Sequence, residues 1–313
     1  MFTTANGYVV GILRDNPEIQ ELLIQIDGYS EPERAYNYPG LYKRLITGDK
    51  VVVNTAAVKL GLGTGGRHFV IPEYLDCEQL KFPGHIMKLR YTPWQFPILA
   101  AEEEASPYHQ QLTECQTLAG TPVVIAPLHS MLPGIILGFR SVQKKHPKIV
   151  YIMTDGAALP IALSELVRDL KSKLLLDLTV TCGHAFGGDL EAVSIPSALL
   201  VAKESINPDL IIVALGPGVV GTGTPFGFSG IEQSWVIDVV SKLQGIAIVA
   251  PRISSADMRR RHLGISHHTL TILKLANNPA LVGLSKLIPA SLMESIDNQL
   301  RGNQLLKMHQ WYR

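Results

Sequence analysis

One glycine-rich segment of the chain carries residues that could bind a phosphate group. In "LGPGVVGTGTPFGF", Gly216, Gly218 and Gly221 follow the spacing G-x-G-x-x-G. The apolar run "DLIIVAL" before it predicts a strand, and a helix is predicted to begin at Ser229. Loops in this setting hold anions through backbone N–H groups.

Two details of this segment differ from an NAD-binding loop. The helix begins only after "TGTPFGF", and Arg252 stands where an acidic residue should end the next strand. We therefore expect an anion held by backbone amides, with Arg252 or the run Arg259–Arg261 as counter-charge. The alternative is a covering loop that binds nothing itself. The predicted ligand-binding residues are Gly216, Gly218, Gly221, Thr222, Gly223, Thr224, Arg252 and Arg259.

Polar side chains in three other predicted strand-to-helix loops are candidates for catalysis. They are His129, Asp155, His184 and Asp189. Such loops meet at the carboxyl edge of a parallel sheet, where ligands bind. These residue types also suit zinc, manganese or iron, which makes a metal-dependent hydrolase an alternative. Because no H-x-H or H-x-x-x-H spacing occurs, we assign no metal ligand and no cofactor, and each residue could equally be a turn residue.

Three further residues could take part in acid–base or nucleophilic chemistry. His267 and His268 follow Ser266 at the start of a predicted helix, where they serve either as an acid or base or as first-turn residues. Cys182 is a weaker candidate for a nucleophile, because small buried cysteines are common. The chain has neither a G-x-S-x-G elbow nor a Walker loop.

A second G-x-G-x-x-G spacing, at Gly61, Gly63 and Gly66, lies in a different setting. Predicted strands both precede and follow it, so no helix N-terminus faces a phosphate. We expect a tight turn or bulge with positive φ angles. Arg67 and His68 would take part in a functional site only if they reach the other domain.

The composition limits the classes of protein that the chain can belong to. Hydrophobic residues make up 46% of the 313 residues and charged residues 18%, which indicates a folded protein. The formal net charge of +1, from 28 basic and 27 acidic residues, argues against a nucleic-acid partner. The chain lacks a signal peptide and any apolar run of roughly 18 residues, so we expect no membrane contact. An odd set of widely spaced cysteines, Cys77, Cys115 and Cys182, favours a cytoplasmic location.

The elements that position these residues fall into two predicted domains. Residues 1–95 contain short strand-like runs with turn signals, which predict a small all-β, barrel-like domain. Residues 96–313 alternate apolar strands with helices, which predicts a doubly wound, Rossmann-like parallel sheet of the α/β class. A helix is predicted to begin at Ser106–Pro107 and to stop at Gly120.

Four motifs resemble those of a known family. They are "NTAAVKLGLGTGGRHFV", "TDGAALP", "TCGHAFGGDLEAV" and "LGPGVVGTGTPFGF". With them the chain resembles, along most of its length, a bacterial family catalogued as a domain of unknown function, DUF3866. The resemblance implies no established activity, so no role passes from it to any residue.

The favoured function is binding of a small anionic or phosphorylated metabolite at the carboxyl edge of the sheet, by an enzyme or a binding protein. One alternative is a non-catalytic protein that senses a metabolite or binds a partner, and the metal-dependent hydrolase is another. A homodimer is the default expectation for the oligomeric state.

Overall fold

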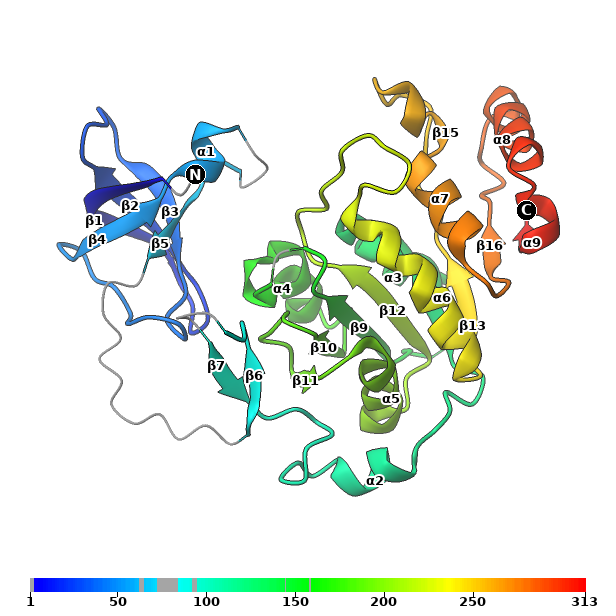
Figure 1. The fold of residues 1–313 in the computed structure, drawn as a ribbon, viewed down its shortest axis with the longest axis horizontal. Coiled ribbons are helices and arrows are strands. Elements are labelled where there is room, and N and C mark those ends of the chain that lie inside the picture. The colour runs from blue at the N-terminus through cyan, green and yellow to red at the C-terminus, as the bar shows by residue number, and fades with distance from the viewer. Residues whose placement is uncertain (1–2, 62–64, 72–83, 92–94, 144, 158) are drawn as a thin grey trace. The chain divides into compact units, whose positions relative to one another are not determined.

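The computed structural model describes residues 3–61, 65–71, 84–91, 95–143, 145–157 and 159–313 (Figure 1). The chain divides into two compact units, Met1–Lys81 and Phe82–Arg313. Gly63 and Cys77 lie outside the described residues. Each unit is described by itself.

The first unit is a small β-barrel, as the sequence predicts. Its strands close in the order β1-β2-β3-β5-β4, and β1 pairs with β4. Alternate residues of the strands, among them Leu22, Ile24 and Ile26, point into a common apolar core. The elements are β1 (Thr4–Asp15), β2 (Gln20–Ile26), β3 (Glu33–Asn37), β4 (Lys50–Asn54), α1 (Ala56–Lys59) and β5 (His68–Ile71).

Gly61 and Gly66 lie in turns between α1 and β5. Gly61 and Gly66 have φ angles of +62° and +76°, which side-chain-bearing residues rarely adopt. The prediction of positive φ angles is therefore confirmed for these two glycines. Arg67 Nε donates to Glu21 Oε1 at 3.1 Å, and His68 is buried.

The second unit is built on an eight-stranded sheet in which every neighbouring pair is parallel. The order is β11-β10-β9-β12-β8-β13-β16-β17. These strands are β8 (Pro122–Ile125), β9 (Ile149–Thr154), β10 (Leu178–Cys182), β11 (Leu190–Ala192), β12 (Leu210–Leu215), β13 (Ile246–Val249), β16 (Leu281–Gly283) and β17 (Gln310–Tyr312). Two short antiparallel pairs add β6 (Ile86–Lys88) with β7 (Phe96–Ile98) and β14 (Ile253–Ser254) with β15 (Gly264–Ile265).

Helices cover both faces of this sheet, which confirms the doubly wound α/β prediction (Figure 1). The helices are α2 (His109–Glu114), α3 (Leu132–Val142), α4 (Glu165–Ser172), α5 (Ile195–Ile206), α6 (Gln233–Lys242), α7 (His267–Leu275), α8 (Ala290–Gly302) and α9 (Leu305–Met308). Strand residues such as Ile152 and Val213 pack with α5, α6, α7 and α8 in one apolar core. Their neighbours Met153 and Ile212 pack with α3 and α4 in another. This alternation along fully buried strands explains their continuous apolar sequences.

One local feature differs from the sequence expectation. The helix predicted to run to Gly120 is the short α2, because the following backbone bonds to the end of α6 instead. Leu118 N donates to Leu243 O at 2.7 Å, and Gly120 N donates to Gln244 O at 2.9 Å. The sequence predicts a domain boundary between residues 95 and 96, and β6 (Ile86–Lys88) groups with the second unit.

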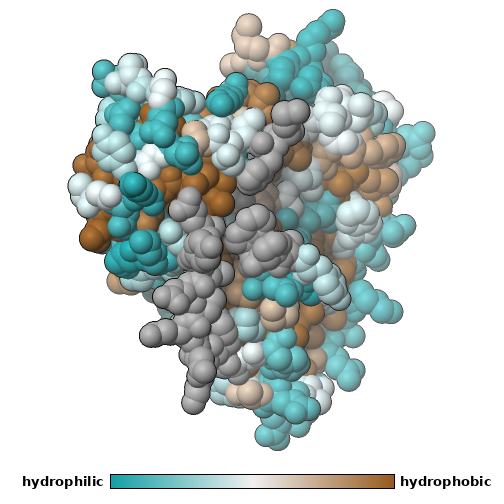
Figure 2. Space-filling model, turned by 60° about the vertical axis from the view of Figure 1, so that its left-hand side comes forward, coloured by the Kyte–Doolittle hydropathy of each residue, from teal (hydrophilic) through white to brown (hydrophobic). Residues whose placement is uncertain are grey.

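The surface mixes polar and apolar residues over the face seen in Figure 2. Large apolar side chains that are exposed include Tyr8 and Ile46 of the first unit and Trp235 of the second. Within the described ranges, every helix is too short or too polar to cross a membrane.

Candidate functional site

A pocket of about 390 Å³ opens beside the carboxyl ends of β8, β12 and β13, which are neighbours in the sheet. This edge is where ligands bind in open parallel sheets, and the volume suits a small metabolite. We call it the arginine pocket. Its lining residues are Leu128, Val219, Gly221, Gly223, Arg252, Arg259, Arg261, His262 and His268.

The glycine-rich loop after β12 folds back on itself as a short hairpin. Thr222 N donates to Gly227 O at 2.7 Å and Ser229 N donates to Val220 O at 3.0 Å, which places Gly221 opposite Phe228. Gly221 and Gly223 line the arginine pocket. The two glycines at the pocket therefore lie in a hairpin, several residues before the helical turn that begins at Ser229. In an NAD-binding loop, by contrast, the glycines lead directly into the helix.

The other predicted glycine-loop residues have different surroundings. The hydroxyls of Thr222 and Thr224 lie 2.9 Å apart, and Thr222 Oγ1 also donates to Gly227 O, so both threonines hold the hairpin together. Gly216 is buried directly after β12, and Gly218 has a φ of +98°. None of these four lines the pocket.

Three arginines meet at the pocket, and one carboxylate neutralises part of their charge. Asp257 accepts hydrogen bonds from Arg252 Nη2 at 2.8 Å and from Arg259 Nε and Nη2 at 3.0 and 3.1 Å. The hydrogen bonds from the side chain and backbone N–H of Arg259, with the charge of Arg259, hold the pKa of Asp257 well below its usual range. Arg261 is exposed and lies over Gly223, and within the described part of the chain it pairs with no carboxylate. Three guanidinium charges against one carboxylate leave an excess of positive charge at the pocket.

Three histidines form a cluster on the inner side of the pocket. His262 ends the turn Arg260–His262, and His267 and His268 begin α7. One ring nitrogen from each lies within 4.8 Å of the others. We call these three residues the histidine cluster.

Two of the three rings of the histidine cluster are held by a neighbouring side chain. His262 Nδ1 lies 2.7 Å from Ser266 Oγ, the hydroxyl that caps α7 by accepting from His268 N. The ring of His268 stacks on Phe228, with centroids 4.0 Å apart and planes within 7°. His267 Nε2 is buried and has no hydrogen-bond partner among the described residues.

The three imidazoles are neutral near neutral pH. Burial, together with the nearby charges of Arg252 and Arg259, lowers the pKa of His262 to about 4. Burial, together with the other two histidines, lowers the pKa of His268 to about 4 as well. Burial and then Arg261 lower the pKa of His267. Neutral imidazoles have a lone pair available for a metal or a proton.

His129, which the sequence nominates for catalysis, lies inside the protein. Its Nε2 is 2.7 Å from Ser164 Oγ, and its Nδ1 is 3.1 Å from Tyr151 Oη. Ser164 Oγ accepts from Val167 N, and the Tyr151 hydroxyl donates to Leu215 O, which assigns the Nδ1–H tautomer to His129. Burial lowers the pKa of His129 to about 4. Both ring nitrogens are engaged, so the ring as placed has none free for a ligand.

Asp155 and His184 are neighbours at the ends of β9 and β10. His184 N donates to Asp155 Oδ2 at 2.9 Å, and the His184 ring accepts from Leu89 N at 3.1 Å. Gly183 between the strand and His184 has a φ of +64°, and a Cβ there would lie 2.3 Å from Asp155 Oδ2. A glycine is therefore required for this approach.

Asp189 lies at the other end of β10. The chain between β10 and α5 contains the edge strand β11, which runs parallel to β10, so residues 183–189 return the chain to the start of β10. Burial tends to raise the pKa of Asp189, but bonds from Lys171 and Thr179 outweigh it and lower the pKa. No three of the four predicted catalytic side chains form a metal-binding group within the described ranges.

Glu232 is a half-buried carboxylate in the turn Ser229–Glu232. It accepts a hydrogen bond from Thr154 Oγ1 at the end of β9. Burial raises its pKa, the Thr154 bond lowers it, and nearby Asp155 raises it again. Glu232 and Asp155 thus place two acidic groups together beside β9.

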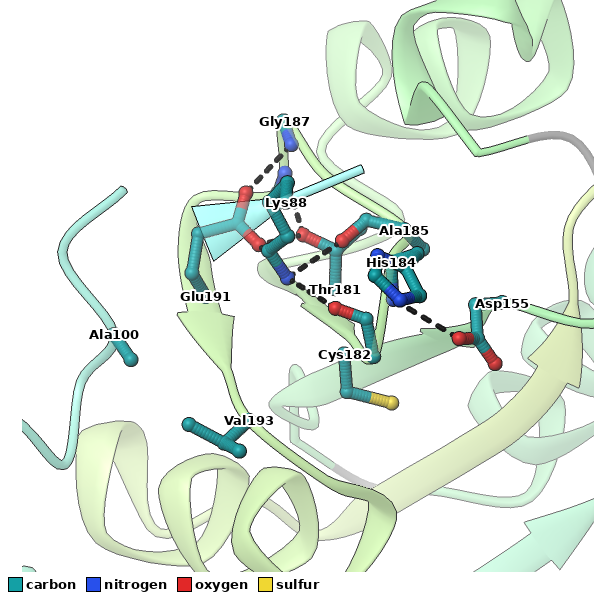
Figure 3. Close-up of polar contacts among 12 residues, drawn as sticks. Lys88, Ala100, Asp155, Thr181, Cys182, His184, Ala185, Gly187, Glu191 and Val193 are labelled. Atoms are coloured by element: carbon teal, nitrogen blue, oxygen red, sulfur yellow. Dashed lines mark hydrogen bonds and ion pairs between the residues drawn. The ribbon is translucent and has the colours of Figure 1, made fainter. Parts of the chain in front are cut away.

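Lys88 on β6 is fully buried and organises the loop after β10 (Figure 3). Its Nζ donates to Gly183 O at 2.9 Å and Ala185 O at 2.8 Å, and it lies 3.1 Å from Glu191 Oε2. Glu191 also accepts from Thr181 Oγ1 and Gly187 N. This network is fully bonded, so it fixes the β6–β7 hairpin on the sheet. In the sequence, the single indication of this network is a lysine within the stretch "GHIMKL".

Cys182 is unsuited to act as a nucleophile. It is buried, and burial raises the pKa of its thiol to about 12. A thiol in this state stays protonated at neutral pH and reacts slowly.

Comparison with known proteins gives one family and no characterised relative. No curated protein matches the chain. A family model described as "Protein of unknown function (DUF3866)" matches residues 34–313, which include the arginine pocket, the histidine cluster and the Lys88 network. Because this match covers most of the chain, the protein belongs to the DUF3866 family.

Proposed function

We propose that the protein binds a small anion of the phosphate class, such as a phosphorylated metabolite, in the arginine pocket. The observation that carries this proposal is the exposed guanidinium of Arg261, which has no carboxylate partner in the described part of the chain and lies beside Arg252 and Arg259. Guanidinium groups bind phosphate oxygens through paired, charge-assisted hydrogen bonds.

The walls of the pocket support the same ligand class. Gly221 and Gly223 bring backbone close to the bound group, which side chains at these positions would hinder. Leu128 and Val219 add a small apolar surface for the non-phosphate part of a metabolite. Predicted ligand-binding residues Gly221, Gly223, Arg252 and Arg259 belong to this proposed site.

Thermal unfolding in the presence of ligands tests the proposal. Inorganic phosphate, pyrophosphate, sugar phosphates and nucleotides are screened with metal-free protein in a buffer containing a chelator. A ligand at about 100 times its Kd stabilises the native protein by about 2.7 kcal/mol, so a hit raises the Tm.

Variants at two neighbouring arginines identify the site. Arg261→Ala should weaken binding of the hit about 10- to 100-fold, as expected when a charged hydrogen bond is lost. Arg260→Ala is the matched control, because Arg260 is exposed in the same turn and does not line the pocket. Equal affinities in the two variants, or no stabilisation by any anion, would refute the proposal.

A further inference from the structure

The histidine cluster has the donor set of a transition-metal site. Its three imidazole rings come from two adjacent elements, the turn Arg260–His262 and the start of α7. Their ring nitrogens already lie within 4.8 Å of one another, so small rotations of the rings bring all three to one ion. Three imidazoles without a carboxylate or thiolate suit zinc, whereas calcium and magnesium prefer oxygen ligands.

The unpartnered nitrogen of His267 points independently to a ligand. Its Nε2 is buried and makes no hydrogen bond to the described residues. Leaving a polar atom unbonded in the interior destabilises the native state, so such atoms in native proteins call for an explanation. A metal ion at the centre of the cluster would satisfy this nitrogen.

The groups around the cluster orient its rings as metal sites require. Ser266 Oγ accepts a hydrogen bond from the backbone N–H of His268 and lies 2.7 Å from His262 Nδ1. This contact leaves His262 Nε2 for a metal. Phe228 stacks against His268 and fixes the plane of that ring. Partners of this kind set the tautomer and direction of metal-binding histidines.

Asp257 offsets part of the positive charge beside the histidine cluster. Arg252 and Arg259 both bond to it, whereas Arg261 lacks a carboxylate partner among the described residues. His262 and His268 line the pocket, so an ion held by the cluster has one side open to it.

We propose that His262, His267 and His268 bind one zinc ion, with a fourth coordination position open to the arginine pocket. Three protein ligands and one open position are the arrangement of zinc ions that bind water or substrate. The fourth position would take an oxygen of water or of the anion. This proposal goes beyond anion binding and does not depend on it, because the three nitrogens hold the ion without an anion.

Metal titration of the untagged full-length chain tests the proposal. The protein is stripped with a chelator, dialysed into phosphate-free buffer, and titrated with Zn²⁺ in competition with a chromophoric indicator. Co²⁺ is then added to the stripped wild-type protein as a spectroscopic probe. We expect one ion per chain and visible absorption bands of a four- or five-coordinate Co²⁺ site, which Zn²⁺ abolishes.

Variants locate the ion. His267→Ala and His268→Ala should each lower the zinc affinity at least about 100-fold, since loss of a mere outer partner of a ligand already costs 10- to 100-fold. His146→Ala, at an exposed histidine outside the cluster, should leave the affinity unchanged. Circular dichroism of the metal-free variants shows whether they are folded, and the wild-type Co²⁺ spectrum does not rely on any variant.

The outcomes separate the two proposals. Absence of a stoichiometric ion in the wild-type protein, or equal zinc affinity in the cluster variants and His146→Ala, overturns the metal site. Either result leaves the anion measurement untouched, because that measurement is made with a chelator present. Conversely, zinc binding without any anion hit supports the metal site and counts against the phosphate-class ligand.

Discussion

At the scale of single residues, histidine side chains of this protein have different hydrogen-bonding surroundings. His129 is enclosed by Ser164 and Tyr151 and has both ring nitrogens bonded, whereas His267 is partly buried with one nitrogen unbonded. The sequence gives no reason to separate them, because each simply follows a predicted strand or begins a helix. Only the surrounding hydrogen bonds decide which histidine is structural.

His129 should make the stability of the protein dependent on pH. Its pKa is about 4 in the native state and 6.5 ordinarily, so between these values the unfolded chain binds a proton that the native state does not. The contribution is present above pH 6.5 and is lost as the pH falls towards 4, by up to about 3 kcal/mol.

Comparison with His129→Gln isolates this contribution from those of other groups. We expect the wild type to be more stable than the variant at pH 7.5, and the difference in the free energy of unfolding to shrink steadily towards pH 4. Urea unfolding at a series of pH values measures it. A difference that stays constant over this range would show that His129 does not titrate as described.

At the scale of elements, short segments place the functional side chains. The strand β11 has three residues, and Asp189 directly before it lies at the start of β10. The hairpin of the glycine-rich loop brings Gly221 and Gly223 to the pocket. Segments this short leave little periodic signal in a sequence. Their positions come from pairing with neighbours that are distant along the chain.

The β6–β7 hairpin offers a test at this scale. Lys88→Met should destabilise the second unit by about 3–5 kcal/mol, because it leaves the Glu191 carboxylate and two carbonyl groups without their buried partner. Adding Glu191→Met should recover part of this loss, since the unpaired carboxylate is then removed.

Tryptophan fluorescence during urea unfolding measures this effect selectively. Among the described residues the tryptophans are Trp235 and Trp311, and both belong to the second unit. A single variant within about 0.5 kcal/mol of the wild type would indicate that the Lys88 network contributes little.

At the scale of the whole molecule, the division into two units predicts where the chain can be cut. A fragment of residues 84–313 keeps Lys88 with Glu191 and the contact of Phe96 with Phe186, whose ring centroids are 5.0 Å apart. A fragment of residues 96–313 begins at the boundary that the sequence predicts and lacks β6.

The longer fragment should unfold cooperatively and resist urea better than the shorter one. The expected difference is about 3–5 kcal/mol, as for the loss of a partner from a buried ion pair. Far-UV circular dichroism against urea concentration measures it for both fragments. Equal stability would place the functional boundary of the second unit at residue 96.

The sequence by itself determined the classes of the two units, because their patterns depend on local chemistry. Continuous apolar runs such as "IVYIMT" arise when both faces of a parallel strand are buried. Serine is a residue type that commonly caps helices, as Ser194 and Ser266 do here. It also pointed to Gly221, Gly223, Arg252 and Arg259 as residues of one region.

Tertiary structure alone decided which of these residues meet and what state they are in. The pairing of Asp257 with Arg252 and Arg259, but not with Arg261, depends on geometry in a loop that has no sequence periodicity. Convergence of His262 with His267 and His268 likewise depends on how β14 and β15 fold the chain back before α7. The physical reason is that charge pairing, burial and ligand distances are properties of positions in space, which a one-dimensional pattern does not encode.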